Sequence, residues 1–202
     1  MAPRLSIIIP HKSTILNDEA MHLNIQMLFD NTVMPYELII DTETPKDPYM
    51  IWNEASKHAR GEYLVFSNSD VLMGPDWDVY MVTGCEYNSI VTGYLVEPGN
   101  IGVASVNIHK DFGRSPQSFK RGEFERFAAN ERVLSLKEER GWYMPCCVRK
   151  DWFLSTGGFP TDIPFPNPND IIFWERCIEE YGTKLLRANS FAYHFQNLSA
   201  RV

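Results

Sequence analysis

The first seventy residues alternate between short apolar runs and helical segments, and this alternation constrains the fold more than any other feature of the chain. The apolar runs lie at residues 5–9, 36–40 and 63–67, and their length and composition are typical of buried parallel strands. Segments with helical spacing at 17–31 and 49–59 separate these runs. The sequence therefore predicts an α/β fold with a Rossmann-like, mostly parallel central sheet flanked by helices.

The ends of the first two helices carry residues that are typical of helix caps. We expect Asn17 or Asp18 to cap the first helix, because their side chains accept hydrogen bonds from the free N–H groups of a helix start. We expect Gly61 to end the second helix, because glycine readily adopts the left-handed conformation that closes many helices.

The rest of the chain continues the α/β pattern without an internal repeat or a low-complexity linker. Further strands are expected at 89–95, 101–108, 142–148, 184–187 and 191–195, and further helices at 75–83, 123–139 and 169–181. Residues 109–121 are polar and contain glycine and proline, so we expect a long loop there, of a length that is often functional or mobile.

Polar residues follow each of the first three predicted strands. These residues are Pro10 and His11 after the first, Asp41 after the second, and Asn68, Ser69 and Asp70 after the third. The carboxyl ends of parallel strands meet at one edge of a sheet, where ligands bind, and a carboxylate there can hold a hard metal ion. Asn, Ser and Asp are equally ordinary turn residues. Because GxGxxG and GxxxxGK[ST] loops are absent from the sequence, standard dinucleotide and P-loop chemistry fit poorly.

Two later residues could also take part in chemistry. Asp170 opens the last predicted helix, where helix capping alone would explain an aspartate. His194 lies in the last predicted strand between Tyr193 and Phe195, where it could equally be a core histidine with satisfied hydrogen bonds.

The charge balance excludes some classes of partner. The net charge is −7 and the isoelectric point is about 5.2, so we expect no nucleic-acid partner bound in a basic groove. An acidic protein that binds a phosphorylated ligand needs a metal ion or helix N-termini at the site.

The four cysteines and the lengths of the apolar runs bear on where in the cell the protein is expected. Cys85, Cys146, Cys147 and Cys177 include no CxxC pair, which argues against zinc and against a disulfide framework. We expect buried thiols in a reducing compartment. The N-terminus has no signal-peptide pattern, and no apolar run approaches the roughly 20 residues of a membrane span. We therefore expect a cytoplasmic protein without a transmembrane segment.

Several sequence blocks, taken in order, resemble the GT-A-fold glycosyltransferases, specifically family 2. The blocks are LSIIIP at 5–10, ELIID at 37–41, the stretch 53–70 that ends in a DxD-like Asn68-Ser69-Asp70, CVRKDWF at 147–153 with GGF at 157–159, Asn169-Asp170 with Arg176 and Gly182, and His194. The similarity extends over roughly residues 5–195, with a gap at 95–140. Matching blocks in the right order are far more specific than any one of them.

The resemblance implies one GT-A-like domain over residues 1–202. Its nucleotide-sugar-binding half would span about 1–94, and its acceptor-binding and catalytic half about 95–202, with a small acceptor-side subregion. The implied activity is that of an inverting hexosyltransferase. Such an enzyme moves a sugar from a nucleotide-diphosphate donor, most often a UDP-sugar, to a glycan or another hydroxyl acceptor, with Mn²⁺ or Mg²⁺ as cofactor.

The resemblance also implies roles for individual residues. Asp70 and His194 would hold the metal, and Asp170 would be the general base. Asp41 would contact the nucleotide base. The other residues expected at the donor site are Pro10, His11, Asn53, Asn68 and Ser69, and those expected at the acceptor site are Trp142 and Asn169.

The chain departs from the family pattern at acidic positions. Asn68 stands where the DxD motif begins, Asn169 stands where a glutamate is usual, and Thr42 follows Asp41 where a second aspartate is common. These changes keep two alternatives open. One is a GT-A-like domain that binds a nucleotide sugar or a glycan without turnover. The other is a nucleotidyltransferase, although residues 11–14 lack the glycine-rich loop usual in that class.

Overall fold

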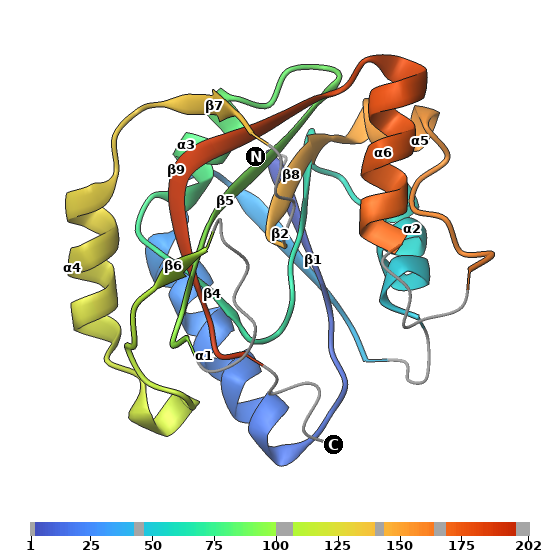
Figure 1. Ribbon diagram of the computed structural model, residues 1–202. Coiled ribbons are helices and arrows are strands. Elements are labelled where there is room, and N and C mark those ends of the chain that lie inside the picture. Colours follow the sequence, from blue (N-terminus) through green and yellow to red (C-terminus); the bar gives the residue numbers. More distant parts are fainter. Residues whose placement is uncertain (1–2, 43–46, 100–106, 140–143, 164–168, 197–202) are drawn as a thin grey trace.

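The computed structural model describes residues 3–42, 47–99, 107–139, 144–163 and 169–196, which form one sheet with helices on both faces (Figure 1). The strands are β1 Leu5–Pro10, β2 Tyr36–Asp41, β3 Tyr63–Phe66, β4 Val71–Met73, β5 Ser89–Glu97, β6 Ile108–His109, β7 Leu136–Glu138, β8 Cys146–Arg149 and β9 Lys184–His194. The helices are α1 Ile15–Asn31, α2 Pro48–His58, α3 Trp77–Thr83, α4 Arg121–Glu131, α5 Lys150–Ser155 and α6 Asn169–Tyr181, with a 3-10 turn at Pro116–Ser118.

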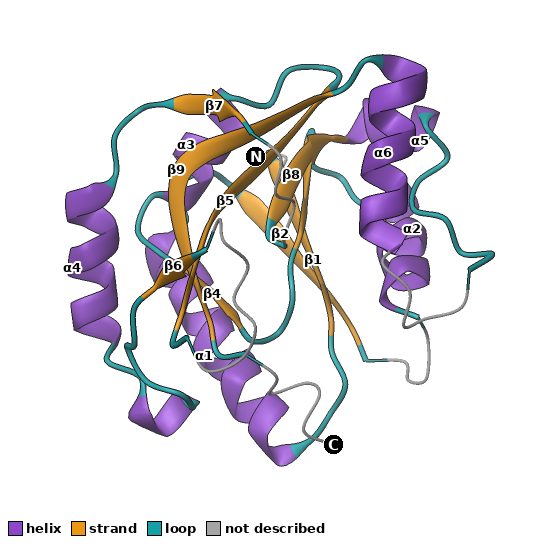
Figure 2. Cartoon of the chain, viewed as in Figure 1, coloured by secondary structure: helices purple, strands orange, loops and turns teal. Residues whose placement is uncertain are grey.

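The sheet has the strand order β2-β1-β3-β8-β5-β9-β4, with β6 paired to β5 and β7 paired to β9. Strands β1, β2, β3, β5, β6 and β9 point in one direction, and β4, β7 and β8 point in the other. The predicted mostly parallel sheet flanked by helices is therefore confirmed (Figure 2).

The helices cover the two faces of the sheet with different side chains. Helices α2, α5 and α6 pack on one face through a cluster rich in aromatic residues, which includes Trp52, Phe153, Phe159, Phe173 and Trp174. Helices α1 and α3 pack on the opposite face through aliphatic side chains and Trp77. Helix α4 adds a third cluster, in which its Phe124 lies against β9. The sheet therefore lies between layers of packed side chains.

The first helix begins earlier than the sequence predicts. Helix α1 is capped by Thr14, whose hydroxyl accepts a hydrogen bond from Asn17 N at 3.2 Å. Asn17 is buried and donates to Lys12 O at 3.0 Å, so it does not act as the cap. The expected cap at Asn17 or Asp18 is wrong, because Thr14 lies one turn earlier and has the extended backbone that a cap requires.

Gly61 has a different structural role from the expected one. The C-cap of α2 is Ala59, two residues before it. A Cβ at Gly61 would lie 2.6 Å from Leu5 C and from Ser6 N, so only glycine allows the chain to pass this close to β1. Gly61 is therefore required by packing against the sheet rather than by the end of the helix.

Three other elements differ from the sequence expectation. The helix expected at 123–139 ends at Glu131, and Leu136–Glu138 pairs with β9 as an edge strand. The two strands expected between 184 and 195 are one strand, β9. The short strand β4 was not expected. The first residues of the strands expected at 101–108 and 142–148 lie outside the described residues.

The four cysteines are free and buried, as expected. Within the described ranges, no helix is both long enough and apolar enough to cross a membrane.

Candidate functional site

The predicted strand ends do meet at one edge of the sheet. Pro10 and Asp41 are register partners at the ends of β1 and β2, and His11 N donates to Asp41 O at 2.8 Å. On the other side of β1, Ser67 N donates to Ile8 O at 3.2 Å. The polar residues that follow β1, β2 and β3 therefore line a single edge.

The loop after β1 is tied to α1 by a buried histidine. His11 is 8% exposed, and its Nε2 lies 2.7 Å from Asp18 Oδ1. The hydrogen bond from His11 is the main cause that lowers the pKa of the Asp18 carboxyl. This contact fixes the course of the main chain at Pro10 and His11.

A buried asparagine of α1 holds the main chain of the Asn68–Ser69–Asp70 turn. Asn24 is fully buried, and its Nδ2 donates to Asn68 O at 3.0 Å and to Ser69 O at 3.3 Å. Its neighbour seven residues later, Asn31, donates to Met73 O at 2.9 Å. Buried asparagines seven residues apart share one helix face. The seven-residue spacing of these asparagines was the one sequence feature that could have indicated that α1 binds the main chain near the turn.

Asp70 and His194 lie beside each other, although 124 residues separate them. Val71 and His194 are register partners in the antiparallel β4–β9 pair, and Phe195 N donates to Asp70 O at 3.3 Å. Asp70 is 1% exposed, and its Oδ2 lies 3.5 Å from His194 Nε2. This oxygen accepts no hydrogen bond within the described part of the chain.

Glu97 is part of the same site, although sequence reasoning missed it. Its Oε1 lies 2.7 Å from His194 Nδ1, and its Oε2 accepts a hydrogen bond from Asn107 Nδ2 at 2.7 Å. Burial by itself lowers the pKa of His194, but the carboxylates of Asp70 and Glu97 outweigh burial and raise this pKa to about 9. The sequence signal was an acidic residue at the end of an apolar strand, in the region where the family resemblance has a gap.

The Asp70–His194 pair fits a divalent cation that a ligand completes. Mg²⁺ in phosphate sites is commonly held by one or two carboxylates together with substrate phosphates and water, and imidazole nitrogen is a ligand for transition metals. The buried Asp70 Oδ2 accepts no hydrogen bond from the described residues, so a metal ion could bind this oxygen without breaking one. Among the described residues, no group of three or more His, Cys, Asp and Glu side chains is arranged to hold an ion. The pair therefore suits a metal shared with a phosphorylated ligand better than a cage made of protein alone.

Asp170 lies at the start of α6 and contacts the start of α2. Tyr49 Oη donates to Asp170 Oδ1 at 3.1 Å. Burial raises the pKa of Asp170, and hydrogen bonds from the Ile171 backbone and from Tyr49 oppose this rise. A carboxylate whose pKa is raised by burial is suited to accept a proton near neutral pH.

Three other predicted site residues have different surroundings. Asn53 Nδ2 donates to Phe159 O at 2.8 Å and its Oδ1 accepts from Phe159 N at 2.9 Å, so both ends of the amide bind the main chain. Asn169 is fully buried and donates to Ile163 O at 3.0 Å. The contacts of Asn53 hold the turn at Phe159, and the contact of Asn169 holds the start of α6 against Ile163. Neither amide faces an open surface through these bonds. Trp142 lies outside the described residues.

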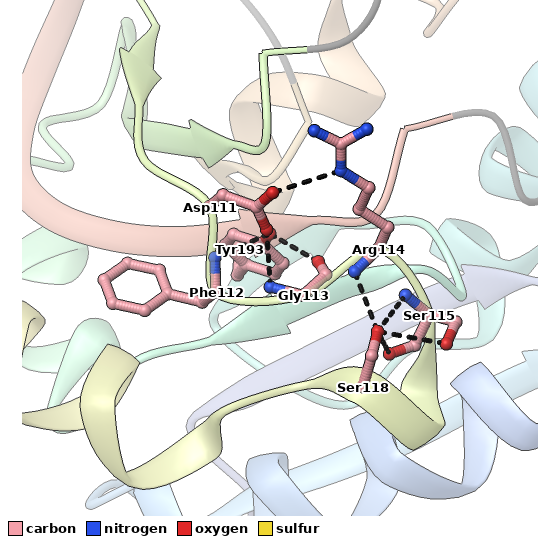
Figure 3. A network of polar contacts seen from close by, with 7 residues as sticks. All are labelled: Asp111, Phe112, Gly113, Arg114, Ser115, Ser118 and Tyr193. Atoms are coloured by element: carbon pink, nitrogen blue, oxygen red, sulfur yellow. Dashed lines mark hydrogen bonds and ion pairs between the residues drawn. The ribbon is translucent and has the colours of Figure 1, made fainter.

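The segment expected as a long loop is ordered against β9 (Figure 3). Tyr193 Oη donates to Gly113 O at 2.6 Å and accepts from Phe112 N at 3.1 Å. Within the loop, the Ser118 hydroxyl accepts hydrogen bonds from Arg114 N at 3.0 Å and from Ser115 N at 3.1 Å. Phe112 is 3% exposed, so its ring belongs to the core. The loop therefore braces the strand end that carries His194.

The comparisons with known proteins give a structural relationship but no sequence relationship. No family model matches the sequence, and no curated protein matches it. Among solved structures, the chain is similar to the crystal structure of GalNAc-T7 with UDP, GalNAc and Mn²⁺, with a TM-score of 0.67 and 9% sequence identity. The similarity covers 96% of this chain and 44% of that one, so the chain spans less than half of its neighbour's length.

This likeness identifies the fold. GalNAc-T7 is a glycosyltransferase of GT-A fold, and the described sheet and helices match a single GT-A-like domain. The GT-A fold expected from the sequence is confirmed. At 9% identity the comparison does not distinguish family 2 from other GT-A families.

Proposed function

We propose that this chain is a metal-dependent inverting glycosyltransferase, of family 2 type, that moves a hexose from a UDP-sugar to a glycan or another hydroxyl acceptor. The observation that carries the proposal is the Asp70–His194 pair, which lies at the carboxyl edge of the sheet of a GT-A-like fold. The structural neighbour holds UDP and Mn²⁺, which supports the same ligand classes for this chain.

The donor site is assigned to the ends of β1, β2 and β3. Asp41 would accept a hydrogen bond from the nucleotide base, and the main chain of Pro10 and His11 would line the nucleoside pocket. Asn68 and Ser69 would face the ribose and the diphosphate. The backbone contacts between β1 and β2 support this assignment, because they hold these groups at one edge.

Asp70 and His194 would bind Mn²⁺ or Mg²⁺ together with the diphosphate. When bound, the cation acts as a Lewis acid that stabilises the negative charge of the leaving group. It also supplies the positive charge that a protein of net charge −7 needs at a phosphate site. The uncharged Asn68 leaves Asp70 as the carboxylate of the motif.

Asp170 would be the general base. It would take the proton of the acceptor hydroxyl as that oxygen attacks the anomeric carbon on the face opposite the leaving diphosphate. A single displacement of this kind needs one base and no carboxylate nucleophile, and it inverts the anomeric configuration. The partners of Asn53 and Asn169 suit roles in holding the turn and the helix start beside Asp170.

The test is UDP release and sugar transfer from UDP-hexoses with and without Mn²⁺. Asp70→Ala and Asp170→Asn are each expected to lower turnover at least about tenfold, within the range for loss of a catalytic acid or base group. Asp151→Asn is a matched control, because Asp151 lies in the first turn of α5 and is exposed in an ion pair with Arg149. This variant should retain activity.

Each alternative gives a different result in this test. Metal-dependent UDP-sugar binding without transfer to any acceptor would indicate a binding domain. Pyrophosphate release from UTP and a sugar phosphate would indicate a nucleotidyltransferase. Wild-type transfer by Asp170→Asn would contradict the base assignment, and the absence of metal-dependent donor binding would contradict the whole proposal.

A further inference from the structure

A continuous chain of contacts leads from a loop to the metal-site histidine. Asn107 donates to one carboxylate oxygen of Glu97, and the other oxygen lies 2.7 Å from His194 Nδ1. The opposite ring nitrogen, His194 Nε2, lies 3.5 Å from Asp70 Oδ2. Each nitrogen of the ring therefore faces a different carboxylate.

The strand pairing of β5 fixes Glu97 at a position from which its carboxylate can reach His194 Nδ1. Glu97 is the last residue of β5, one position after Val96, which is the register partner of Tyr193 in β9. On its other side Glu97 pairs with His109 of β6, and its carbonyl accepts from Lys110 N at 2.9 Å. Glu97 is 5% exposed. The position of the carboxylate is therefore set by strands on both sides of β5.

We propose that Glu97 is a positioning residue that orients His194 for metal binding, with Asn107 holding the Glu97 carboxylate in place. When a metal ion replaces the proton on Nε2, the acceptor oxygen of Glu97 keeps the remaining proton on Nδ1, so that Nε2 is the nitrogen free to bind the metal beside Asp70. Hydrogen bonding of a ligating histidine to a carboxylate fixes its ring and raises its basicity as a ligand. The inference rests on the proposed metal site at Asp70 and His194.

The experiment measures Mn²⁺ binding directly, in the presence of UDP, by the electron paramagnetic resonance signal of free Mn²⁺. Glu97→Ala is expected to weaken Mn²⁺ binding by about 10- to 100-fold, the range seen for loss of an outer partner of a metal ligand. Glu97→Gln keeps an acceptor oxygen for Nδ1, so its Mn²⁺ affinity should fall less than that of Glu97→Ala. Glu37→Ala is the matched control, because Glu37 is a largely buried carboxylate on β2 that is bonded to Ser6 and Arg60. It should bind Mn²⁺ within about twofold of the wild type.

A double-mutant cycle separates positioning from a general loss of structure. If Glu97 acts through the imidazole, adding Glu97→Ala to His194→Ala should change Mn²⁺ binding by less than about twofold. An equal loss in both backgrounds would overturn the inference, as would near-wild-type Mn²⁺ binding by a folded Glu97→Ala. If Glu97→Ala does not fold, Glu97→Leu decides, because leucine fills a similar volume but offers no acceptor to Nδ1: a loss of Mn²⁺ binding that vanishes in the His194→Ala background supports the inference, and no loss overturns it.

The wild-type result separates this inference from the proposed function. Wild-type protein that binds no Mn²⁺ with UDP would overturn both. Wild-type binding that is lost in Asp70→Ala but unchanged in Glu97→Ala and Glu97→Gln would overturn the role of Glu97 alone.

Discussion

Tyr49 Oη donates a hydrogen bond of 3.1 Å to Asp170 Oδ1, across 121 residues of sequence. The bond joins the first turn of α2 to the first turn of α6. Burial, followed by the negative charge of Asp170, raises the pKa of Tyr49, so its hydroxyl stays protonated and remains the donor. The helix that follows β2 thereby contributes to the proton affinity of the proposed base.

This contact predicts a shift in the pH dependence of turnover. The base acts when deprotonated, so turnover should fall as pH drops through the pKa of Asp170, which burial raises above its ordinary value. The Tyr49 bond lowers this pKa, so Tyr49→Phe should raise it and move the acid limb of kcat to higher pH. The pH profile of UDP release with acceptor present measures the shift. Tyr63→Phe, on β3, should leave the limb in place, and an unmoved limb in Tyr49→Phe would separate Tyr49 from the base.

Asn24 and Asn31 provide a matched pair for testing the support of the Asp70 turn. Each is a buried α1 asparagine that donates to a main-chain carbonyl, so each Ala variant should lose about 1–3 kcal/mol of unfolding free energy. Of these two asparagines, Asn24 is the one that donates to the carbonyls of Asn68 and Ser69. We therefore expect Mn²⁺ and UDP binding to weaken in Asn24→Ala and to stay near the wild-type value in Asn31→Ala. Equal binding by two folded variants would show that the turn does not depend on Asn24.

Gly61 predicts a stability loss that comes from packing alone. A Cβ there would meet Leu5 C and Ser6 N at 2.6 Å, and relieving such overpacking typically costs about 1–3 kcal/mol. Gly122 is the control, because it lies in α4 and its added Cβ would meet only the end of Arg126, at 3.5 Å. Denaturant unfolding should show Gly61→Ala destabilised and Gly122→Ala unchanged or slightly stabilised, since alanine favours a helix. A neutral Gly61→Ala would contradict the close approach of the chain to β1.

The first half of the fold could be predicted because its signals are local. The strands before Pro10, Asp41 and Asn68 are short apolar runs, and consecutive parallel strands bring their carboxyl ends to one edge. These local signals did not bring Asp70 and His194 together. Only the family resemblance, through the order of its motifs, placed the two residues in one site. Their contact depends on β4, a three-residue strand without a recognisable pattern of its own.

The remaining site residues were hidden for physical reasons. Glu97 reads as the polar end of an apolar strand, and only the pairing of β5 with β9 brings it to His194. Asn24 lies inside a helix where a polar side chain would ordinarily face solvent, and its partners are main-chain carbonyls that leave no mark in the sequence. Contacts of this kind follow from tertiary packing rather than from local preference.

The last prediction concerns Asn53, for which the sequence and the structure suggest different roles. The resemblance implies a donor-binding residue, whereas the structure bonds both ends of its amide to the main chain of Phe159. Arg176 of α6 holds the same turn, donating to Gly158 O at 2.7 Å and to Thr156 O at 3.2 Å. If Asn53 only positions the turn, Asn53→Ala should lower the unfolding free energy by about 1–3 kcal/mol through its unpaired backbone groups.

The binding data then decide between the two roles. A positioning role predicts that UDP binding, measured calorimetrically with Mn²⁺ present, stays within about twofold of the wild type, because the hydrogen bonds that are removed join Asn53 to the main chain of Phe159 and not to the nucleotide. Arg176→Ala is the control that loosens the same turn from the opposite helix, and it should match Asn53→Ala in both measurements. A tenfold or greater loss of UDP binding in Asn53→Ala alone, with the fold intact, would instead make Asn53 a donor-site residue. In that case its amide must exchange the Phe159 main chain for the nucleotide when the donor binds.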